Sequence, residues 1–238
     1  MKQIDEVSKT FYIRNVDSSE RKLINEIVDL HRLSFEGFFL STMNKGFLRH
    51  LYMAFCEHEH SELIVAFENE IPVGFMACSW DTSGVYRFML RRHLIPFAWY
   101  AFLAVLRRPS LISKMFRATS MPKESVRDEN YVKIFSLGVH PDYHGRGFGS
   151  MLLEELKHKT NFARFKYITL ETDAENNDAA NKFYQQNGMK LSSTFVTPEG
   201  RKMNKYHYRI HRNEDQNDDQ DIEQNENQSE KQNEDFIS

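Results

Sequence analysis

The feature that most constrains this chain is a strand that leads through a glycine-rich turn into a helix. Residues 131–139 (YVKIFSLGV) have the apolar and β-branched character of a strand. The segment HPDYHGRGFG follows at 140–149, and an amphipathic helix begins where it ends. Glycines let the backbone turn sharply and lie close to a ligand, while the free N–H groups of a helix start attract anions. This order of elements predicts an anion site that suits a pyrophosphate.

The glycine spacing excludes the two best-known nucleotide motifs. A P-loop needs Gly-Lys-Ser/Thr after its glycines, and none follows here. The dinucleotide-binding fingerprint needs three glycines at another spacing. Because a turn of this kind can also be purely structural, the elements around it decide its meaning.

The rest of the chain alternates between strand and helix patterns. Strands are expected at about 10–16, 62–67, 72–80, 131–139, 167–172, 190–197 and 202–210. Helices are expected from the N-cap candidates Asp17, Ser18 and Ser19 to about 33, at 47–56, after the glycine turn, and at 178–186. A mostly helical insert at about 85–118 precedes the fourth strand and is expected to break near Pro96 and Pro109. The order predicts one mixed α/β domain over residues 1–212.

Two segments then carry a resemblance to a known family. LGVHPDYHGRGFGSMLLEEL closely resembles the acetyl-CoA signature of GNAT acetyltransferases, Gln/Arg-x-x-Gly-x-Gly/Ala, with Gly147 and Gly149 as the signature glycines and His144 in place of Gln or Arg. The run NDAANKFYQQNGM at 177–189 resembles the family's second pattern, Asn-x-x-Ala-x-x-φ-Tyr followed by Gly-Phe, with Met189 in place of Phe. The resemblance implies the GNAT fold, a mixed and mostly antiparallel sheet flanked by helices.

The resemblance also implies acetyl-CoA as the co-substrate, with no metal. Backbone N–H groups of residues 137–139 would hold the acetyl carbonyl and the pantetheine, and those of residues 145–150 would hold the pyrophosphate. Asn177 would bond the pantetheine arm. The predicted cofactor-binding residues are Leu137, Gly138, Val139, His144, Gly145, Arg146, Gly147, Phe148, Gly149, Ser150 and Asn177.

Acetyl transfer to an amine needs a proton donor for the leaving sulfur and an acceptor for the amine's proton. Tyr184 stands at the position of the family's general acid, and the alternative is a packing tyrosine. Glu171 is the candidate base, because strand alternation places it opposite Leu170. It lies six residues before Asn177, whereas family members that use a glutamate on this strand have it five residues before. A water-relayed base, His140 and His144 remain alternatives.

The acceptor is expected to be a primary amine, and its class stays open. Residues 87–117 contain seven Arg/Lys and no acid. They fit a helical lid with solvated charges, a site for a phosphate-bearing amino sugar with Arg91 and Arg92 as contacts, or docking on an anionic membrane. Residues 30–52 faintly resemble acetyltransferases associated with bacterial surface-polysaccharide synthesis, which favours a nucleotide- or lipid-linked amino sugar. That resemblance also implies His31, Phe35, Phe38 and Phe39 near the acceptor, although core packing is the alternative for the phenylalanines.

Two further classes of function stay open. One is acetylation of a protein N-terminus or lysine, and the other is a non-catalytic, membrane-associated protein that binds CoA. Nucleic acid is not an expected partner, since the basic stretch is interleaved with apolar residues. The oligomeric state is left open.

Charge and hydropathy separate a basic body from an acidic tail. Residues 213–238 carry a net charge of −9, whereas the whole chain carries −3, so residues 1–212 carry +6. The composition of residues 213–238 predicts disorder. The N-terminus lacks the apolar segment of a signal peptide. The longest apolar run, 94–106, has thirteen residues, short of the roughly twenty that span a bilayer. A cytoplasmic protein is therefore expected, with peripheral contact at the inner membrane face as the alternative.

Overall fold

The computed structural model describes residues 10–35, 41, 43–107, 130–197 and 200–210, with backbone alone for 101–107. Met1–Tyr208 forms one compact unit, and Arg209–Ser238 is grouped separately. The predicted acidic tail, the end of the insert with Pro109, and Phe38 and Phe39 lie outside the described residues.

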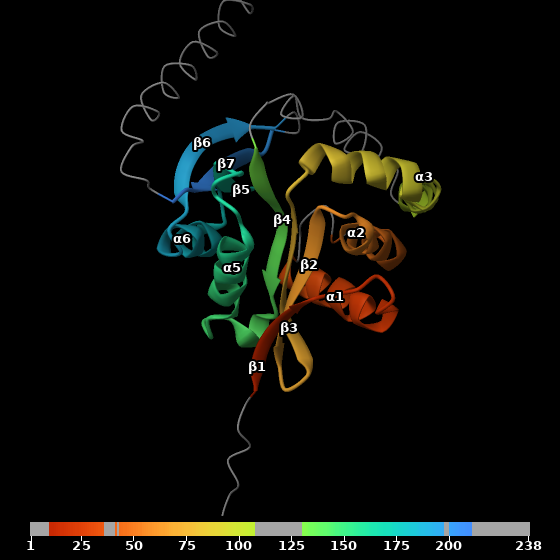
Figure 1. The fold of residues 1–238 in the computed structure, drawn as a ribbon. Helices are drawn as coiled ribbons and strands as arrows, with labels where there is room; N and C mark the ends of the chain where they lie inside the picture. The colour runs from red at the N-terminus through yellow and green to blue at the C-terminus, as the bar shows by residue number, and fades with distance from the viewer. Residues whose placement is uncertain (1–9, 36–40, 42, 108–129, 198–199, 211–238) are drawn as a thin grey trace, which may run out of the picture. The chain divides into compact units, whose positions relative to one another are not determined.

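Seven strands form one mixed sheet in the order β1-β2-β3-β4-β5-β7-β6 (Figure 1). The strands are β1 (Phe11–Asn15), β2 (Ser61–Glu68), β3 (Ile71–Ser79), β4 (Tyr131–Val139), β5 (Tyr167–Asp173), β6 (Lys190–Val196) and β7 (Lys202–Tyr208). In the described sheet, β4 and β5 run parallel and every other neighbouring pair is antiparallel. This confirms the predicted mixed, mostly antiparallel sheet.

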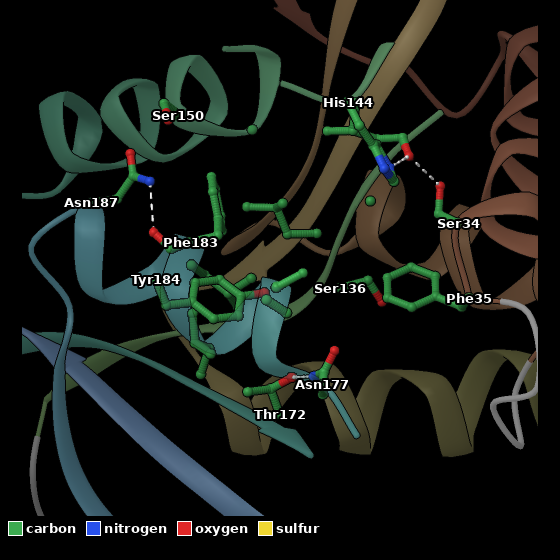
Figure 2. Close-up of a pocket in the computed structure, with 18 of the residues that line it drawn as sticks. Ser34, Phe35, Ser136, His144, Ser150, Thr172, Asn177, Phe183, Tyr184 and Asn187 are labelled. Atoms are coloured by element: carbon green, nitrogen blue, oxygen red, sulfur yellow. Dashed lines mark hydrogen bonds between the residues drawn. The ribbon is translucent and has the colours of Figure 1, made fainter. Parts of the chain in front are cut away.

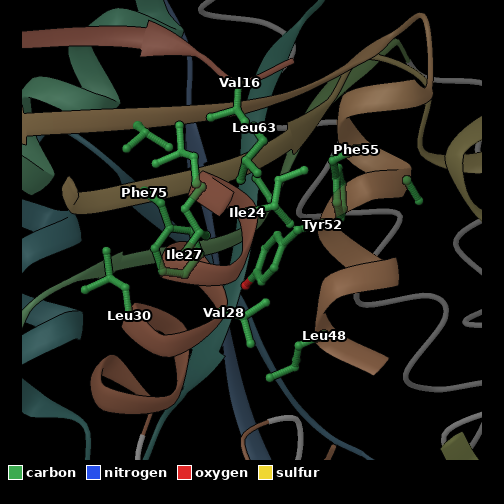
Figure 3. Close-up of a cluster of buried hydrophobic side chains, with 14 of the residues drawn as sticks. Val16, Ile24, Ile27, Val28, Leu30, Leu48, Tyr52, Phe55, Leu63 and Phe75 are labelled. Carbon is green, nitrogen blue, oxygen red and sulfur yellow. The ribbon is translucent and has the colours of Figure 1, made fainter. Parts of the chain in front are cut away.

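Helices cover both faces of the sheet (Figure 1). Helices α1 (Arg21–Ser34) and α2 (Lys45–Glu57) pack on one face, and α5 (Phe148–Lys159) and α6 (Asp178–Gln186) pack on the other. Strand alternation supplies both cores, since Leu63 and Val65 join the cluster under α1 and α2, whereas Ile64 joins the cluster under α5. Figure 3 shows the first cluster, in which Tyr52 and Phe75 lie among aliphatic side chains.

The insert differs from its prediction at Pro96. Helix α3 (Thr82–Arg107) continues through this proline, although the ring removes one backbone donor. Packing against α2 accounts for the continuity, because the Phe97 ring lies 4.8 Å from that of Phe47. Tertiary contacts on both sides of the proline thus outweigh the local break that the sequence predicts.

The start of α1 also differs from its prediction. The helix begins at Arg21, and the N-cap residue is Glu20, whose side chain makes no capping bond. Glu20 instead pairs with Arg14 at 2.7 Å, while the carboxylate of Asp17 accepts the Ser19 N–H. The polar run at 17–19 therefore forms a turn ahead of the helix and does not cap it.

Candidate active site

The sheet opens between β4 and β5. The two strands pair only over residues 131–133 and 167–169 in the described sheet, and beyond these residues they diverge. The remaining part of β4, residues 134–139, keeps its antiparallel pairing with β3. Its other edge therefore faces open space, where backbone groups are free to bind a ligand.

A cavity of about 830 Å³ occupies this opening. Residues from β4, β5, the glycine turn, α6 and the end of α1 line it. Figure 2 shows Ser34, Phe35 and Ser136 on one side, and Phe183, Tyr184 and Asn187 on the other. The cavity brings together these predicted site residues: His31, Leu137, Gly138, Val139, His144, Gly145, Gly147, Phe148, Gly149, Ser150, Glu171, Asn177 and Tyr184.

The glycine turn and the start of α5 form one end of the cavity. Gly145 and Gly147 adopt φ of 73° and 86°, a left-handed conformation that favours glycine. A Cβ built on either would meet no atom within 4 Å, so the turn faces open space. Gly149 has another role, because its Cβ would lie 2.9 Å from the Phe183 ring, so α5 and α6 meet there. The uncapped N–H groups at the start of α5 therefore lie beside a volume that a diphosphate can fill.

Two residues of the turn hold it in place through their side chains. His144 Nε2 lies 2.9 Å from the Val139 carbonyl oxygen, to which the Ser34 hydroxyl also donates at 3.0 Å. Arg146 forms a two-pronged pair with the buried carboxylate of Glu68, and its guanidinium lies over the Tyr143 ring at 4.8 Å. Arg146 does not line the cavity, unlike its neighbours in the turn. Its predicted part in cofactor binding therefore has no support from its side chain.

Asn177 and Tyr184 lie on the α6 side. The Asn177 amide nitrogen donates to the Thr172 hydroxyl at 2.7 Å, and its amide oxygen points away from that bond (Figure 2). Tyr184 is 8 % exposed, and burial raises its pKa to about 12. The phenol therefore keeps its proton at neutral pH, as a proton donor requires.

Glu171 reaches the cavity but is paired. Its carboxylate lies 3.3 Å from Lys133 Nζ, and both side chains are largely buried. The Glu171 carboxylate is therefore engaged in an ion pair at the edge of the cavity. His140, an alternative base, accepts the Asp142 N–H at 3.2 Å and caps the short helix η3 (Pro141–Tyr143), so its ring supports the turn.

The two predicted arginine contacts lie elsewhere. Arg91 and Arg92 are exposed on α3, where they line a separate hollow with Arg87 and His58. The structure therefore does not bring them together with the residues of the main cavity.

Sequence reasoning missed several residues that belong to this site. Tyr52 on α2 bonds the ring of His31, Ser136 on β4 lines the cavity, and Arg201 pairs with Asp173 at the rim. Ser136 gave a faint signal, as a hydroxyl within an apolar strand. Tyr52 gave none, because an aromatic residue on an apolar helix usually serves packing.

An open edge between two strands, with a glycine turn and a helix start at its mouth, defines an α/β protein that holds an extended, diphosphate-bearing ligand. The sequence matches the model of the Acetyltransferase (GNAT) family over residues 24–189. The chain therefore belongs to the GNAT acetyltransferase family, whose co-substrate is acetyl-CoA. A comparison with curated protein sequences found no match.

Several solved structures share the fold at low sequence identity. The putative acetyltransferase yncA from Salmonella typhimurium, solved with its cofactor acetyl-CoA, is 15% identical with a TM-score of 0.52, over 84% of this chain and 94% of that one. An N-acetyltransferase from Staphylococcus aureus Mu50 is 15% identical with a TM-score of 0.54, over 85% and 99%. NAA60 from Arabidopsis thaliana, in complex with acetyl-CoA, is 16% identical with a TM-score of 0.50, over 84% and 99%.

No group of three or more His, Cys, Asp or Glu side chains among the described residues is arranged to hold a metal ion. No helix of the same residues is both long and apolar enough to cross a membrane.

Proposed function

We propose that this acetyltransferase moves the acetyl group of acetyl-CoA to a primary amine bound in the cavity between β4 and β5. The observation that carries the proposal is the junction of three parts in one cavity: the open edge of β4, the start of α5 and the buried Tyr184. The residues fit the co-substrate, because the turn at Gly145 and Gly147 leaves open space beside free helix N–H groups.

Each part has a chemical task. When bound, acetyl-CoA supplies the acetyl group as a thioester. Backbone N–H groups of residues 137–139 hold and polarise the acetyl carbonyl, and those of residues 145–150 hold the diphosphate. Asn177 bonds the pantetheine arm through its amide oxygen, which accepts no hydrogen bond from a described residue. Tyr184 Oη gives its proton to the leaving sulfur, for which its buried, neutral phenol is suited.

The acceptor that we propose first is a phosphate-bearing amino sugar, linked to a nucleotide or a lipid. The support is the faint resemblance of residues 30–52, which include the cavity residues His31, Ser34 and Phe35. Protein N-termini and lysines are the alternative acceptors, and a non-catalytic CoA-binding protein is the alternative to an enzyme.

The test is a thiol-release assay with mass spectrometry of the products. The panel contains UDP-glucosamine, other nucleotide-linked amino sugars, and peptides with free N-termini or lysines. We expect acetyl-CoA binding, thiol release and a product heavier by one acetyl group with an amino sugar. Acetylation of peptides alone would overturn the acceptor class. Binding of acetyl-CoA without turnover of any amine would contradict the catalytic role.

A second function is favoured by the exposed side of α3, which we propose docks on an anionic membrane surface. Leu90, Leu94, Ile95 and Trp99 are 46%, 53%, 82% and 58% exposed, which is unusual for large apolar side chains. Arg87, Arg91 and Arg92 are exposed on the same helix, and none of them forms an ion pair with a described residue. Arginines that bind headgroups beside inserted Trp and Leu are typical of interfacial helices.

Co-sedimentation with vesicles tests this docking. We expect binding to vesicles with phosphatidylglycerol and loss of binding when Arg87, Arg91 and Arg92 are changed to alanine, since each basic residue contributes about 1 kcal/mol. The matched control removes three exposed lysines elsewhere, Lys22, Lys166 and Lys182. Equal binding to neutral phosphatidylcholine vesicles, or an equal loss in the control, would rule out the proposed surface.

A further inference from the structure

A buried histidine on the α1 side of the cavity has one ring nitrogen without a partner. His31 is 2 % exposed, and its ring lines the cavity with Ser34 and Phe35. Its Nε2 is buried and has no hydrogen-bond partner among the described residues. A buried polar atom without a partner costs free energy, so an atom of this kind at a ligand cavity indicates a contact that the ligand completes.

The other nitrogen of the ring is held by a chain of hydroxyl groups. His31 Nδ1 lies 2.6 Å from the Tyr52 hydroxyl, and this hydroxyl in turn bonds the side chain of Ser136 on β4. Tyr52 is fully buried, and burial raises the pKa of its hydroxyl, so the phenol stays protonated. Ser136 lowers the pKa of the Tyr52 phenol, as a donor to the phenol oxygen does, and when this oxygen also accepts from His31 Nδ1–H, Nε2 is left as a hydrogen-bond acceptor.

The surroundings keep the imidazole neutral. The ring packs against Phe35 and Phe75, at centroid distances of 4.8 and 6.2 Å. Burial lowers the pKa of His31 to about 4, and no nearby charge contributes to that shift. A neutral imidazole with a free Nε2 is therefore present throughout the neutral pH range.

We propose that His31 receives the proton of the acceptor amine through Nε2, and that Tyr52 and Ser136 hold its ring in the Nδ1–H tautomer. The inference rests on the proposed acetyl transfer and assigns the proton acceptor that the reaction needs. The Glu171 carboxylate, the other candidate, is already engaged by Lys133 Nζ at 3.3 Å. His31 has no such partner at Nε2.

The proton balance of the step is complete. The lone pair of the amine forms the new C–N bond while the C–S bond breaks. The amine proton passes to His31 Nε2, and the sulfur takes the proton of Tyr184 Oη. Water then returns one proton from the imidazolium to the tyrosinate, so that both side chains regain their starting state.

The first experiment measures the tautomer of His31 in the wild-type protein. Two-bond ¹H–¹⁵N correlation spectra of ¹⁵N-histidine-labelled protein at pH 7.5 distinguish the two neutral tautomers, and the His31→Gln variant assigns the signal. We expect a proton on Nδ1 and none on Nε2. An Nε2–H tautomer would overturn the inference, because that nitrogen would then donate. Tyr52→Phe should shift the tautomer equilibrium, since it removes the hydroxyl that fixes it.

The second experiment compares the kinetics of variants. We expect His31→Gln to lower kcat by about 100-fold or more, as loss of a general base does, with the acetyl-CoA Kd from calorimetry within about twofold of wild type. The acceptor is UDP-glucosamine, or the panel amine with the highest kcat/KM. His158→Gln, an exposed histidine on α5, is the matched control and should keep wild-type kcat. Thermal unfolding confirms that each variant folds.

The outcomes separate this inference from the proposed function. Thiol release by the wild type with an unchanged kcat in His31→Gln removes His31 from the mechanism and leaves the acetyltransferase intact. An equal loss of acetyl-CoA affinity and kcat assigns His31 a structural role and also overturns the inference. If the wild type releases no thiol with any amine, the proposed function fails, and the tautomer measurement still decides the state of His31.

Discussion

The two ends of the cavity are built in different ways. The end at the glycine turn uses backbone groups, with Gly145 and Gly147 in left-handed conformations beside the start of α5. The end at α1 uses side chains from three elements, in which His31, Tyr52 and Ser136 meet inside a packed core. A backbone site tolerates changes in most side chains, whereas a side-chain relay depends on each member. Under the proposed function, the first end holds the co-substrate common to the family, whereas the second is free to differ with the acceptor.

The largest effect is expected at Tyr184, which lines the cavity. Tyr184→Phe should lower kcat by about 100- to 1000-fold, because it removes the proton donor for the sulfur. The acetyl-CoA Kd should stay within about threefold, since the backbone end is unchanged. Steady-state kinetics and calorimetry measure the two quantities. Tyr208→Phe, on β7 and outside the cavity, is the control, and an equal kcat loss there would contradict the assignment.

Acid should destabilise the side-chain end. The folded pKa of His31 is about 4, below the ordinary 6.5 of the unfolded chain, so the unfolded state binds a proton that the folded state excludes. The contribution of neutral His31 to the free energy of unfolding is fully present above pH 6.5. About 2–3 kcal/mol of it is lost as the pH falls toward 4. Urea unfolding of wild type and His31→Gln between pH 7 and 4.5 measures the difference.

Burial also lowers the pKa of His50 and His58, so part of the acid sensitivity is shared by both proteins. The difference between the two curves therefore isolates His31. Parallel curves would show that His31 is not buried in a neutral form.

The smallest of the three effects is expected at the backbone end. Gly147→Ala places a Cβ at φ of 86°, which costs roughly 1–2 kcal/mol of backbone strain. Part of this strain should weaken acetyl-CoA binding and raise its Kd about tenfold, because the turn presents the free N–H groups. Gly188→Ala, at φ of 80° after α6, has a similar strain but lies outside the cavity. It should lower the melting temperature without changing the Kd, and an equal Kd change would contradict the role of the turn.

Local patterns in the sequence predicted the backbone end well. The strand at 131–139 and the helix at 178–186 appear with the predicted bounds, and Gly188 has the left-handed φ expected after a helix end. Signals of this kind depend on neighbours in the sequence, so they can be read from a single chain. The turn and the motif at 177–189 were sufficient to predict acetyl-CoA as the co-substrate.

The features that the sequence did not predict all depend on distant contacts. Pro96 stays within α3 because α2 packs against it, and Glu20 leaves α1 uncapped because Arg14 holds its carboxylate. Similarly, the relay from His31 reaches Ser136 across 105 residues of sequence through Tyr52. No local pattern encodes such a meeting, since it results from the packing of α1 against β4 and of α2 against α1, β2 and β3.

The contact between Gly149 and Phe183 fixes how closely the start of α5 approaches α6. The space for a single methyl group at residue 149 is already taken by the Phe183 ring, and Tyr184 follows directly in the chain. The lack of a side chain at residue 149 thus fixes the distance between the start of α5, the proposed diphosphate site, and Tyr184, the proposed proton donor. A larger residue at 149 would push α6 outward and so displace Tyr184, which should slow acetyl transfer. The glycine turn at residues 145–147 would keep its conformation.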